Sequence, residues 1–153
     1  MKKIFLVVCI CVLFVACGKK ELKQIEENKT KVDEIVSEIA SSPLTASNPG
    51  AYIDEHKEKY DELVDMGIDA LKVIFYDFGK KAEDAGATLE DHIKILAAQE
   101  ILGDENVIEE SSSPYAWYKE FKRFVISASE QNDKETMKVN LPKSYALLDI
   151  LKK

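Results

Sequence analysis

Apolar residues recur at steps of three and four positions through most of this chain, and that period is typical of α-helices. The first such pattern predicts an amphipathic helix over residues 21–40. Its apolar positions are Leu22, Ile25, Val32, Ile35, Val36 and Ile39. This helix needs a surface to cover its apolar face. The sequence leaves three surfaces open: the rest of the chain, a second copy in a short coiled coil, or the membrane interface.

Prolines and glycines divide the residues that follow. Small residues and two prolines in 41–50 predict a linker, after which Ser47 or Asn48 can cap a helix that has Pro49 in its first turn. We expect that helix to end near Gly67 and a second one to run from Asp69 to about Lys81. Because the junction at Gly67 is short, the two helices are predicted to lie antiparallel as a hairpin.

A second hairpin is predicted from a capping box formed by Thr88 and Asp91. Its first helix ends at Gly103 and its return helix begins at Ser113-Pro114, with a closing helix from Pro142. The two hairpins start about forty residues apart, a spacing similar to that of HEAT repeats. The expected fold is all-α: antiparallel helical hairpins packed as one small domain, weakly HEAT-like.

The N-terminus has a different pattern. Two lysines precede the apolar run Ile4 to Val15, and small residues follow, which is the arrangement of a signal peptide. The run is too short to span a bilayer, which takes about 20 residues. By this pattern alone, the segment could be an ordinary secretory signal or an uncleaved anchor.

Residues 14–17, Phe-Val-Ala-Cys, resemble the lipobox of bacterial lipoproteins. The resemblance implies that residues 1–16 are removed and that Cys17 becomes a diacylglyceryl cysteine with acyl chains such as palmitate. It also implies a lipid-anchored protein at the extracytoplasmic face of the cell membrane. We therefore divide the chain into a signal peptide at 1–16, an anchor with helix and linker at 17–47, and a helical domain at 48–153.

Composition supports an envelope protein that does not bind nucleic acid. The chain carries a formal net charge of −7, which disfavours contact with phosphate backbones. Two of its three cysteines, Cys9 and Cys11, lie in the signal peptide, so no disulfide framework is expected.

A second resemblance covers roughly residues 52–124. It rests on Tyr52-Ile53, Tyr60-Asp61, Leu63-Val64, Gly67, Ala70-Leu71, Phe78, Ile101-Leu102-Gly103, Trp117-Tyr118 and Phe121-Lys122. This order is similar to a poorly characterised helical domain in extracytoplasmic segments of Firmicutes lipoproteins and in regions attached to BlaR1-type membrane peptidases. The resemblance implies a location and no particular chemistry. The chain departs from that pattern at 111–114, where it has Ser-Ser-Ser-Pro in place of Trp, Ser and Gly.

No catalytic, metal or cofactor site is predicted. The two histidines, His56 and His92, lack the spacing of metal ligands, and the serine runs lack the context of a nucleophile. The acidic pairs 26–27, 90–91 and 109–110 are interpreted as solvated surface.

The aromatic segment 114–125 is the best candidate for a binding surface. Its residues Trp117, Phe121, Phe124 and Val125 share one helical stripe and are expected to pack inward. Tyr115 and Tyr118 flank the stripe and could line a groove for a ligand or partner.

The leading functional hypothesis is a non-enzymatic binding or interaction module at the cell envelope, whose partner is an envelope protein or a peptide. Two alternatives remain. One is a protective, immunity-type lipoprotein that captures a peptide, toxin or phage component, and the other is an enzyme with an unrecognised carboxylate site.

Overall fold

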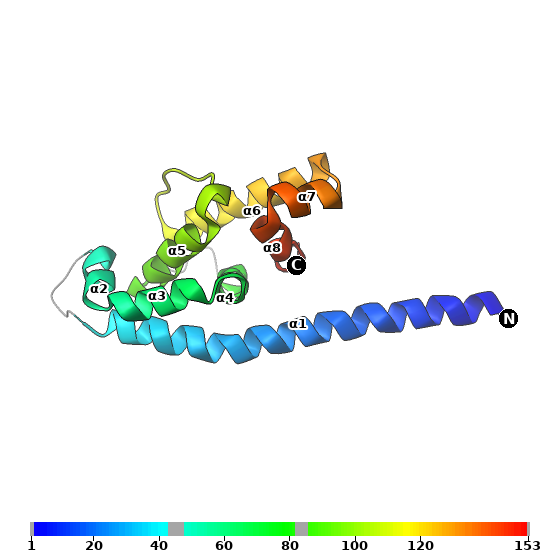
Figure 1. The fold of residues 1–153 in the computed structure, drawn as a ribbon, viewed down its shortest axis with the longest axis horizontal. Coiled ribbons are helices and arrows are strands. Elements are labelled where there is room, and N and C mark those ends of the chain that lie inside the picture. The colour runs from blue at the N-terminus through cyan, green and yellow to red at the C-terminus, as the bar shows by residue number, and fades with distance from the viewer. Residues whose placement is uncertain (1, 43–47, 82–85, 153) are drawn as a thin grey trace.

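The computed structural model describes residues 2–42, 48–81 and 86–152, with side chains described from Lys20 onward. All regular structure in this part of the chain is helical (Figure 1). The helices are α1 (Lys2–Ala40), α2 (Pro49–Glu55), α3 (Lys57–Asp65), α4 (Ile68–Lys80), α5 (Leu89–Leu102), α6 (Pro114–Gln131), α7 (Lys134–Asn140) and α8 (Pro142–Leu151), with a 3₁₀ turn at Gly103–Glu105. They pack on one another as one small domain, which confirms the predicted all-α class.

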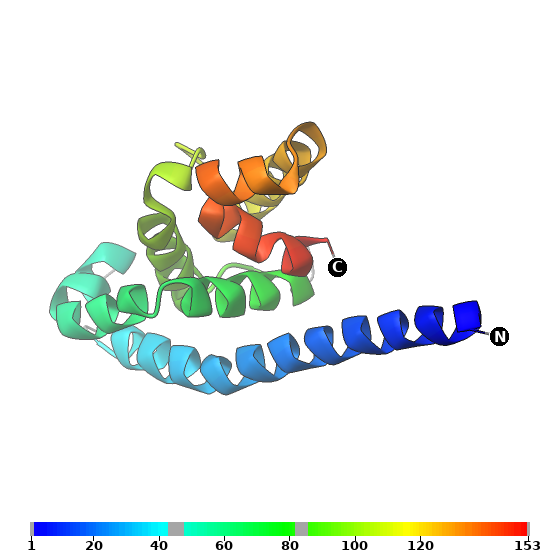
Figure 2. The same ribbon diagram turned by 45° about the vertical axis from the view of Figure 1, so that its right-hand side comes forward.

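The C-terminal half of α1 is part of the core. The apolar face predicted for this segment is buried against the rest of the chain, where α1 packs on α3, α4 and α5 (Figure 2). Its most buried members are Ile25, Val32, Ile35, Val36 and Ile39. Of the three surfaces left open by the sequence, this helix therefore covers the first. The N-terminal part of α1 extends beyond the other helices (Figure 1).

The lipobox lies outside the residues whose side chains are described, and the linker prediction falls partly in 43–47, which the structure leaves undescribed. Within the described part of the chain, no helix combines the length and the apolar character that a membrane crossing requires.

The predicted helix from Pro49 to Gly67 is two helices. Asn48 caps it as expected, and its side chain accepts a hydrogen bond from the Gly50 N–H. The break falls at His56, whose backbone (φ −114°, ψ 37°) is not helical. The His56 Nε2 atom lies 2.8 Å from the Ser42 hydroxyl, so the ring ties this break to the end of α1.

The hairpin predicted at Gly67 is wrong. Gly67 has φ 56° and ψ −127°, a conformation that strains any residue with a Cβ. There the chain kinks without reversing, because the Gly67 N–H still bonds to Val64 O and Gly67 O accepts from Leu71. Figure 1 shows α3 lying along α1 and α4 turned to a different direction. Both helices pack on α1 and α5 instead of on each other.

The second half of the chain follows the sequence prediction more closely. The capping box of Thr88 and Asp91 is present, Gly103 ends α5, and Ser113 caps α6. The apolar positions Ile93, Leu96, Ala97 and Ile101 predict the buried face of α5. Leu96 is instead 37% exposed, whereas Ile95 and Ala98 are buried. Helix α7 was not predicted, and it packs on α6 and α8.

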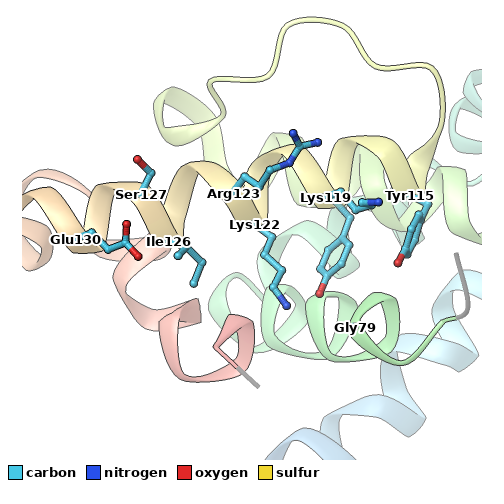
Figure 3. Close-up of a pocket in the computed structure, with 9 residues that line it drawn as sticks. Gly79, Tyr115, Lys119, Lys122, Arg123, Ile126, Ser127 and Glu130 are labelled. Atoms are coloured by element: carbon cyan, nitrogen blue, oxygen red, sulfur yellow. The ribbon is translucent and has the colours of Figure 1, made fainter.

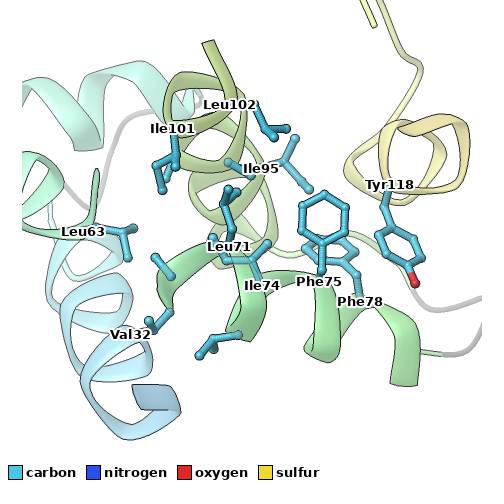
Figure 4. Close-up of a cluster of buried hydrophobic side chains, with 14 of the residues drawn as sticks. Val32, Leu63, Leu71, Ile74, Phe75, Phe78, Ile95, Ile101, Leu102 and Tyr118 are labelled. Atoms are coloured by element: carbon cyan, nitrogen blue, oxygen red, sulfur yellow. The ribbon is translucent and has the colours of Figure 1, made fainter. Parts of the chain in front are cut away.

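An aromatic cluster joins α4 to α6 at the centre of the core. The Phe75 ring lies 5.3 Å from Phe121 and 6.0 Å from Trp117, measured between ring centroids. Trp117 stacks on Phe121 with an interplanar angle of 7°. Figure 4 shows Phe75 and Phe78 of α4 facing Tyr118 of α6. The predicted inward stripe of α6 is thus confirmed for Trp117, Phe121 and Val125, while Phe124 is half-buried.

Four charged side chains connect α1, α4 and α5. The Lys94 ammonium, on a residue only 9% exposed, bonds to Asp33 at 2.8 Å and to Asp77 at 2.9 Å. Lys29 pairs with the same two carboxylates, at 2.8 and 2.7 Å. Burial alone would raise the pKa of Asp33, but hydrogen bonds from Lys29 and Lys94 outweigh it and hold that pKa below its usual value. Asp33 can therefore stay ionised where α1 meets α4 and α5.

Asp91 gives the fold a testable dependence on pH. Burial favours its neutral form, but hydrogen bonds from Lys81 and from the Thr88 backbone N–H outweigh burial and lower its pKa. A carboxyl group whose pKa is lower in the folded state stabilises that state above the unfolded pKa, and this contribution is lost as pH falls through the folded pKa. We expect Asp91→Asn to cost about 1 kcal/mol at pH 7 and less below about pH 4.

Urea unfolding at pH 7 and pH 3, followed by far-UV ellipticity, measures this difference. Asp149→Asn, at an exposed position in α8, is the matched control. A destabilisation by Asp91→Asn that is equally large at both pH values would contradict the role given to the ionised carboxylate.

Candidate functional site

A surface pocket lies along α6 where this helix passes the C-terminal end of α4. It has a volume of about 500 Å³ and is open to solvent. We call it the α6 pocket. Its lining residues are Gly79, Tyr115, Tyr118, Lys119, Lys122, Arg123, Ile126, Ser127 and Glu130. The two tyrosines singled out from the sequence therefore lie together at one surface depression, although its use as a binding site stays a prediction.

Tyr118 forms the inner wall of the α6 pocket and is held rigidly. It is only 4% exposed, and its ring stacks on Phe78 at 5.7 Å and packs on Phe75 at the same centroid distance. Burial raises the pKa of its phenol, with a smaller contribution from Tyr115. Tyr118 is therefore protonated at neutral pH, and its hydroxyl group can donate a hydrogen bond.

The glycine on α4 brings the two helices close enough to form this wall. A Cβ placed on Gly79 would lie 3.1 Å from the Tyr118 hydroxyl oxygen, closer than side chains normally approach. Any larger residue would push the tyrosine or fill the space beside it. Gly79 is in the last turn of α4, where the sequence offers only an isolated glycine within a helical pattern as a signal.

Tyr115 is more exposed than Tyr118 and lies one turn away, with 6.0 Å between the ring centroids. The Lys119 ammonium lies 5.8 Å from the Tyr115 ring centroid, within the range of a cation–π contact. Figure 3 shows Tyr115, Lys122 and Ile126 projecting from α6 toward α4, and Arg123 and Ser127 projecting from α6 away from α4. The pocket thus has an aromatic and aliphatic wall with cations on both sides.

A smaller groove of about 250 Å³ continues from the α6 pocket toward α8. It shares Gly79, Tyr118 and Lys122 with that pocket and adds Phe75, Tyr76, Lys80 and Ile150. The Lys80 ammonium lies 3.9 Å from the Tyr76 ring centroid. Cationic and aromatic side chains therefore continue along this surface.

Another pocket, of about 310 Å³, lies between α5 and the loop that carries the serine run 111–113. His92, Gln99 and Trp117 contribute to its lining. The indole Nε1 atom of Trp117 is buried and has no hydrogen-bond partner in the structure. Of the described residues that line this pocket, only His92 has an acidic or basic side chain.

The remaining candidates from the sequence do not converge on a site. His92 is half-buried beside the serine loop, and His56, expected to face solvent among charged residues, is half-buried against Ser42. Of the acidic pairs, only Asp91 is buried, and it serves the cap of α5. Among the described residues, no group of three or more histidine, cysteine or carboxylate side chains could hold a metal ion.

Sequence reasoning did not identify Lys119, Lys122 and Arg123 as site residues. Lysine and arginine at these spacings are what any solvated helix face carries, so the sequence alone gives no reason to single them out. They line a pocket only because α4 packs beside α6 and supplies Gly79.

Comparison of the chain with protein-family models, with curated protein sequences and with solved structures gave no match.

Proposed function

We propose that this protein is a lipid-anchored binding module on the extracytoplasmic face of the cell membrane, without enzymatic activity of its own. In this proposal, the α6 pocket holds part of an envelope protein or a peptide. The observation that carries the proposal is the pocket itself, because it joins rigid aromatic walls to an accessible cationic rim on a small domain. Rigid aromatic residues bind with a small loss of conformational entropy, and they are enriched where proteins bind partners.

The geometry of α1 supports the anchoring half of the proposal. The helix is continuous from Cys17 to Ile25, and Ile25 is already 2% exposed in the core. These eight residues of helix correspond to about 12 Å. A diacylglyceryl group on Cys17 would supply the two chains needed for stable attachment. It would keep the domain near the bilayer through a helix instead of a flexible tether.

Crosslinking in intact cells tests both halves together. Wild type is compared with Cys17→Ala and Tyr115→Ala, followed by mass spectrometry of the proteins that co-purify. Tyr115 is preferred over Tyr118 for truncation, because the buried Tyr118 ring supports Phe75 and Phe78 and its loss would disturb the core. Tyr118→Phe, which removes only the hydroxyl group, completes the set.

We expect a stoichiometric partner with wild type and loss of most of it with Tyr115→Ala. Cys17→Ala should leave an unprocessed precursor without lipid. Lys134→Gln, at an exposed position of α7, should behave as wild type. If Tyr115→Ala retains the partner, the α6 pocket is not the binding site. If Cys17→Ala still gives a lipidated mature protein, the proposed anchor is wrong.

A further inference from the structure

Lys122 and Arg123 of the α6 pocket differ in their surroundings from several lysines of this protein. Those lysines pair with carboxylates, as Lys72 does with Glu21 at 2.7 Å and Lys31 with Glu62 at 3.1 Å. Among the described residues, by contrast, no carboxylate lies within ion-pair distance of Lys122 or Arg123. Two successive residues of α6 are thus unpaired cations in a chain whose acidic residues outnumber its basic ones.

The balance of charge within the pocket is also positive. Among its described lining residues, three are cationic and only Glu130 is acidic. Glu130 lies two turns beyond Lys122, which is about 12 Å along the helix axis. Figure 3 shows it at the far end of the pocket from Tyr115. Glu130 therefore lies too far along the helix to pair with Lys122.

The wall between these cations is apolar. It consists of the tyrosine rings, the Ile126 side chain and the aliphatic stem of Lys122, over the bare backbone of Gly79. Such a wall favours an apolar group, and the volume of about 500 Å³ is within the range of small-molecule pockets. The Tyr118 hydroxyl group, which lies beside Gly79, adds a hydrogen-bond donor. A ligand that satisfies all of these features carries an apolar body and a negative group.

We propose that the α6 pocket binds an apolar anion, with the apolar body against Tyr115, Tyr118 and Ile126 and the negative group between Lys122 and Arg123. This inference rests on the proposed function, because it names the ligand chemistry of the same pocket. The chemistry can come from a small organic acid or from an apolar peptide segment that carries an acidic residue.

A matched pair of fluorescent probes separates charge from apolarity. Anilinonaphthalene sulfonate is an apolar anion, and phenylnaphthylamine has the same aromatic body without the sulfonate. Both are titrated into the whole chain solubilised with its anchor in a neutral detergent. We expect the anion to bind at least fivefold more tightly than the neutral probe. This preference should decrease as salt is raised from low to physiological concentration, since exposed charges are screened.

Three variants locate the binding. Lys122→Gln combined with Arg123→Gln should weaken the anion about fivefold to tenfold and leave the neutral probe within about twofold, as expected for two partly exposed ion pairs. Ile126→Ser should weaken both probes, because it removes part of the apolar wall. Lys134→Gln removes one exposed lysine of α7 and should change neither. Far-UV ellipticity confirms that each variant is folded.

Displacement of the anionic probe then distinguishes the two sources. Decanoate represents a small organic acid, and a short peptide with alternating phenylalanine and glutamate represents the acidic segment. Displacement by either supports the proposal and names the source. Failure of both to displace the probe overturns it, as do equal affinities of the two probes or unchanged anion binding in the double variant.

The outcome can be separated from that of the proposed function. If the probes show no preference for charge while Tyr115→Ala still abolishes the crosslinked partner, the ligand chemistry is wrong and the binding surface stands. If the anion binds as expected but no envelope protein depends on Tyr115, the pocket takes an apolar anion and the proposed partner is wrong.

Discussion

A chain that begins at Asn48 is expected to be largely unfolded, whereas one that begins at Lys20 is expected to fold. The shorter chain lacks five side chains that are at most 4% exposed: Ile25, Val32, Ile35, Val36 and Ile39. Burying each of them contributes about 1.5–3 kcal/mol, so their loss removes roughly 10 kcal/mol. Domains of this size have only about 5–15 kcal/mol of net stability. The loss therefore consumes most or all of it.

Thermal and urea unfolding of the two purified fragments provide the test. The Lys20 fragment should give one cooperative transition, and the Asn48 fragment should show little helical ellipticity and no transition. A mixing experiment adds a control, because a synthetic peptide of residues 20–42 should restore helicity to the shorter fragment. Cooperative unfolding of the Asn48 fragment alone would show that α1 only covers a domain that folds without it.

The sequence predicted the elements of this fold better than their arrangement. Capping residues are local signals, so Asn48, Thr88 and Ser113 placed three helix starts correctly. A glycine between two helices does not specify an angle, and Gly67 proved to mark a kink. Helix α7 is short, seven residues, and only Met137 of this helix is buried, which leaves little apolar periodicity to detect.

The sequence could not predict which surface the first amphipathic helix packs on. Its apolar face can pack on any apolar surface, so only the tertiary structure identifies the surface that it contacts. The charged residues that fix its position, such as Lys94 and Asp77, come from α5 and α4. Sequence rules treat charged residues as surface, so a lysine that is 9% exposed gives no advance signal.

The sequence predicted the two tyrosines of the candidate site but not its cations or its glycine. Tyr115 and Tyr118 were singled out because they flank the inward stripe of α6, and both line the α6 pocket. The prediction did not foresee that Tyr118 is itself buried, because the ring that covers it, Phe78, lies on another helix. The cations and Gly79 join the tyrosines only through the packing of α4 on α6.

Two side chains, Glu105 and Lys143, connect the start of α8 to the end of α5 by hydrogen bonds in both directions. The sequence did not indicate that Glu105 is buried. The Glu105 carboxylate accepts hydrogen bonds from the backbone N–H groups of Lys143, at 3.0 Å, and Ser144, at 2.8 Å. In return, the Lys143 ammonium donates to the carbonyl groups of Ile101 and Leu102, at 2.7 and 3.2 Å. Free N–H groups at one helix end and free carbonyl groups at another thus find partners in the same contact.

We expect Glu105→Ala to lower the free energy of unfolding by about 2–4 kcal/mol. The Ser144 N–H and, to a lesser degree, the Lys143 N–H would be left without their acceptor, and an unsatisfied buried donor costs about 1–3 kcal/mol. The negative charge at the positive end of the α8 dipole would be lost as well. Glu105→Gln keeps one acceptor oxygen and should cost less than half as much.

Urea unfolding of the two variants beside Glu109→Ala measures these effects. Glu109 is exposed in the same connection between α5 and α6, so its removal should change the free energy of unfolding by less than about 0.5 kcal/mol. Hydrogen exchange gives the local readout, because the amide protons at the start of α8 should lose protection in Glu105→Ala before those of α4. Equal stability of Glu105→Ala and Glu109→Ala would show that solvent can replace the carboxylate, and the start of α8 would then have to be held by Leu147 and Leu151 alone.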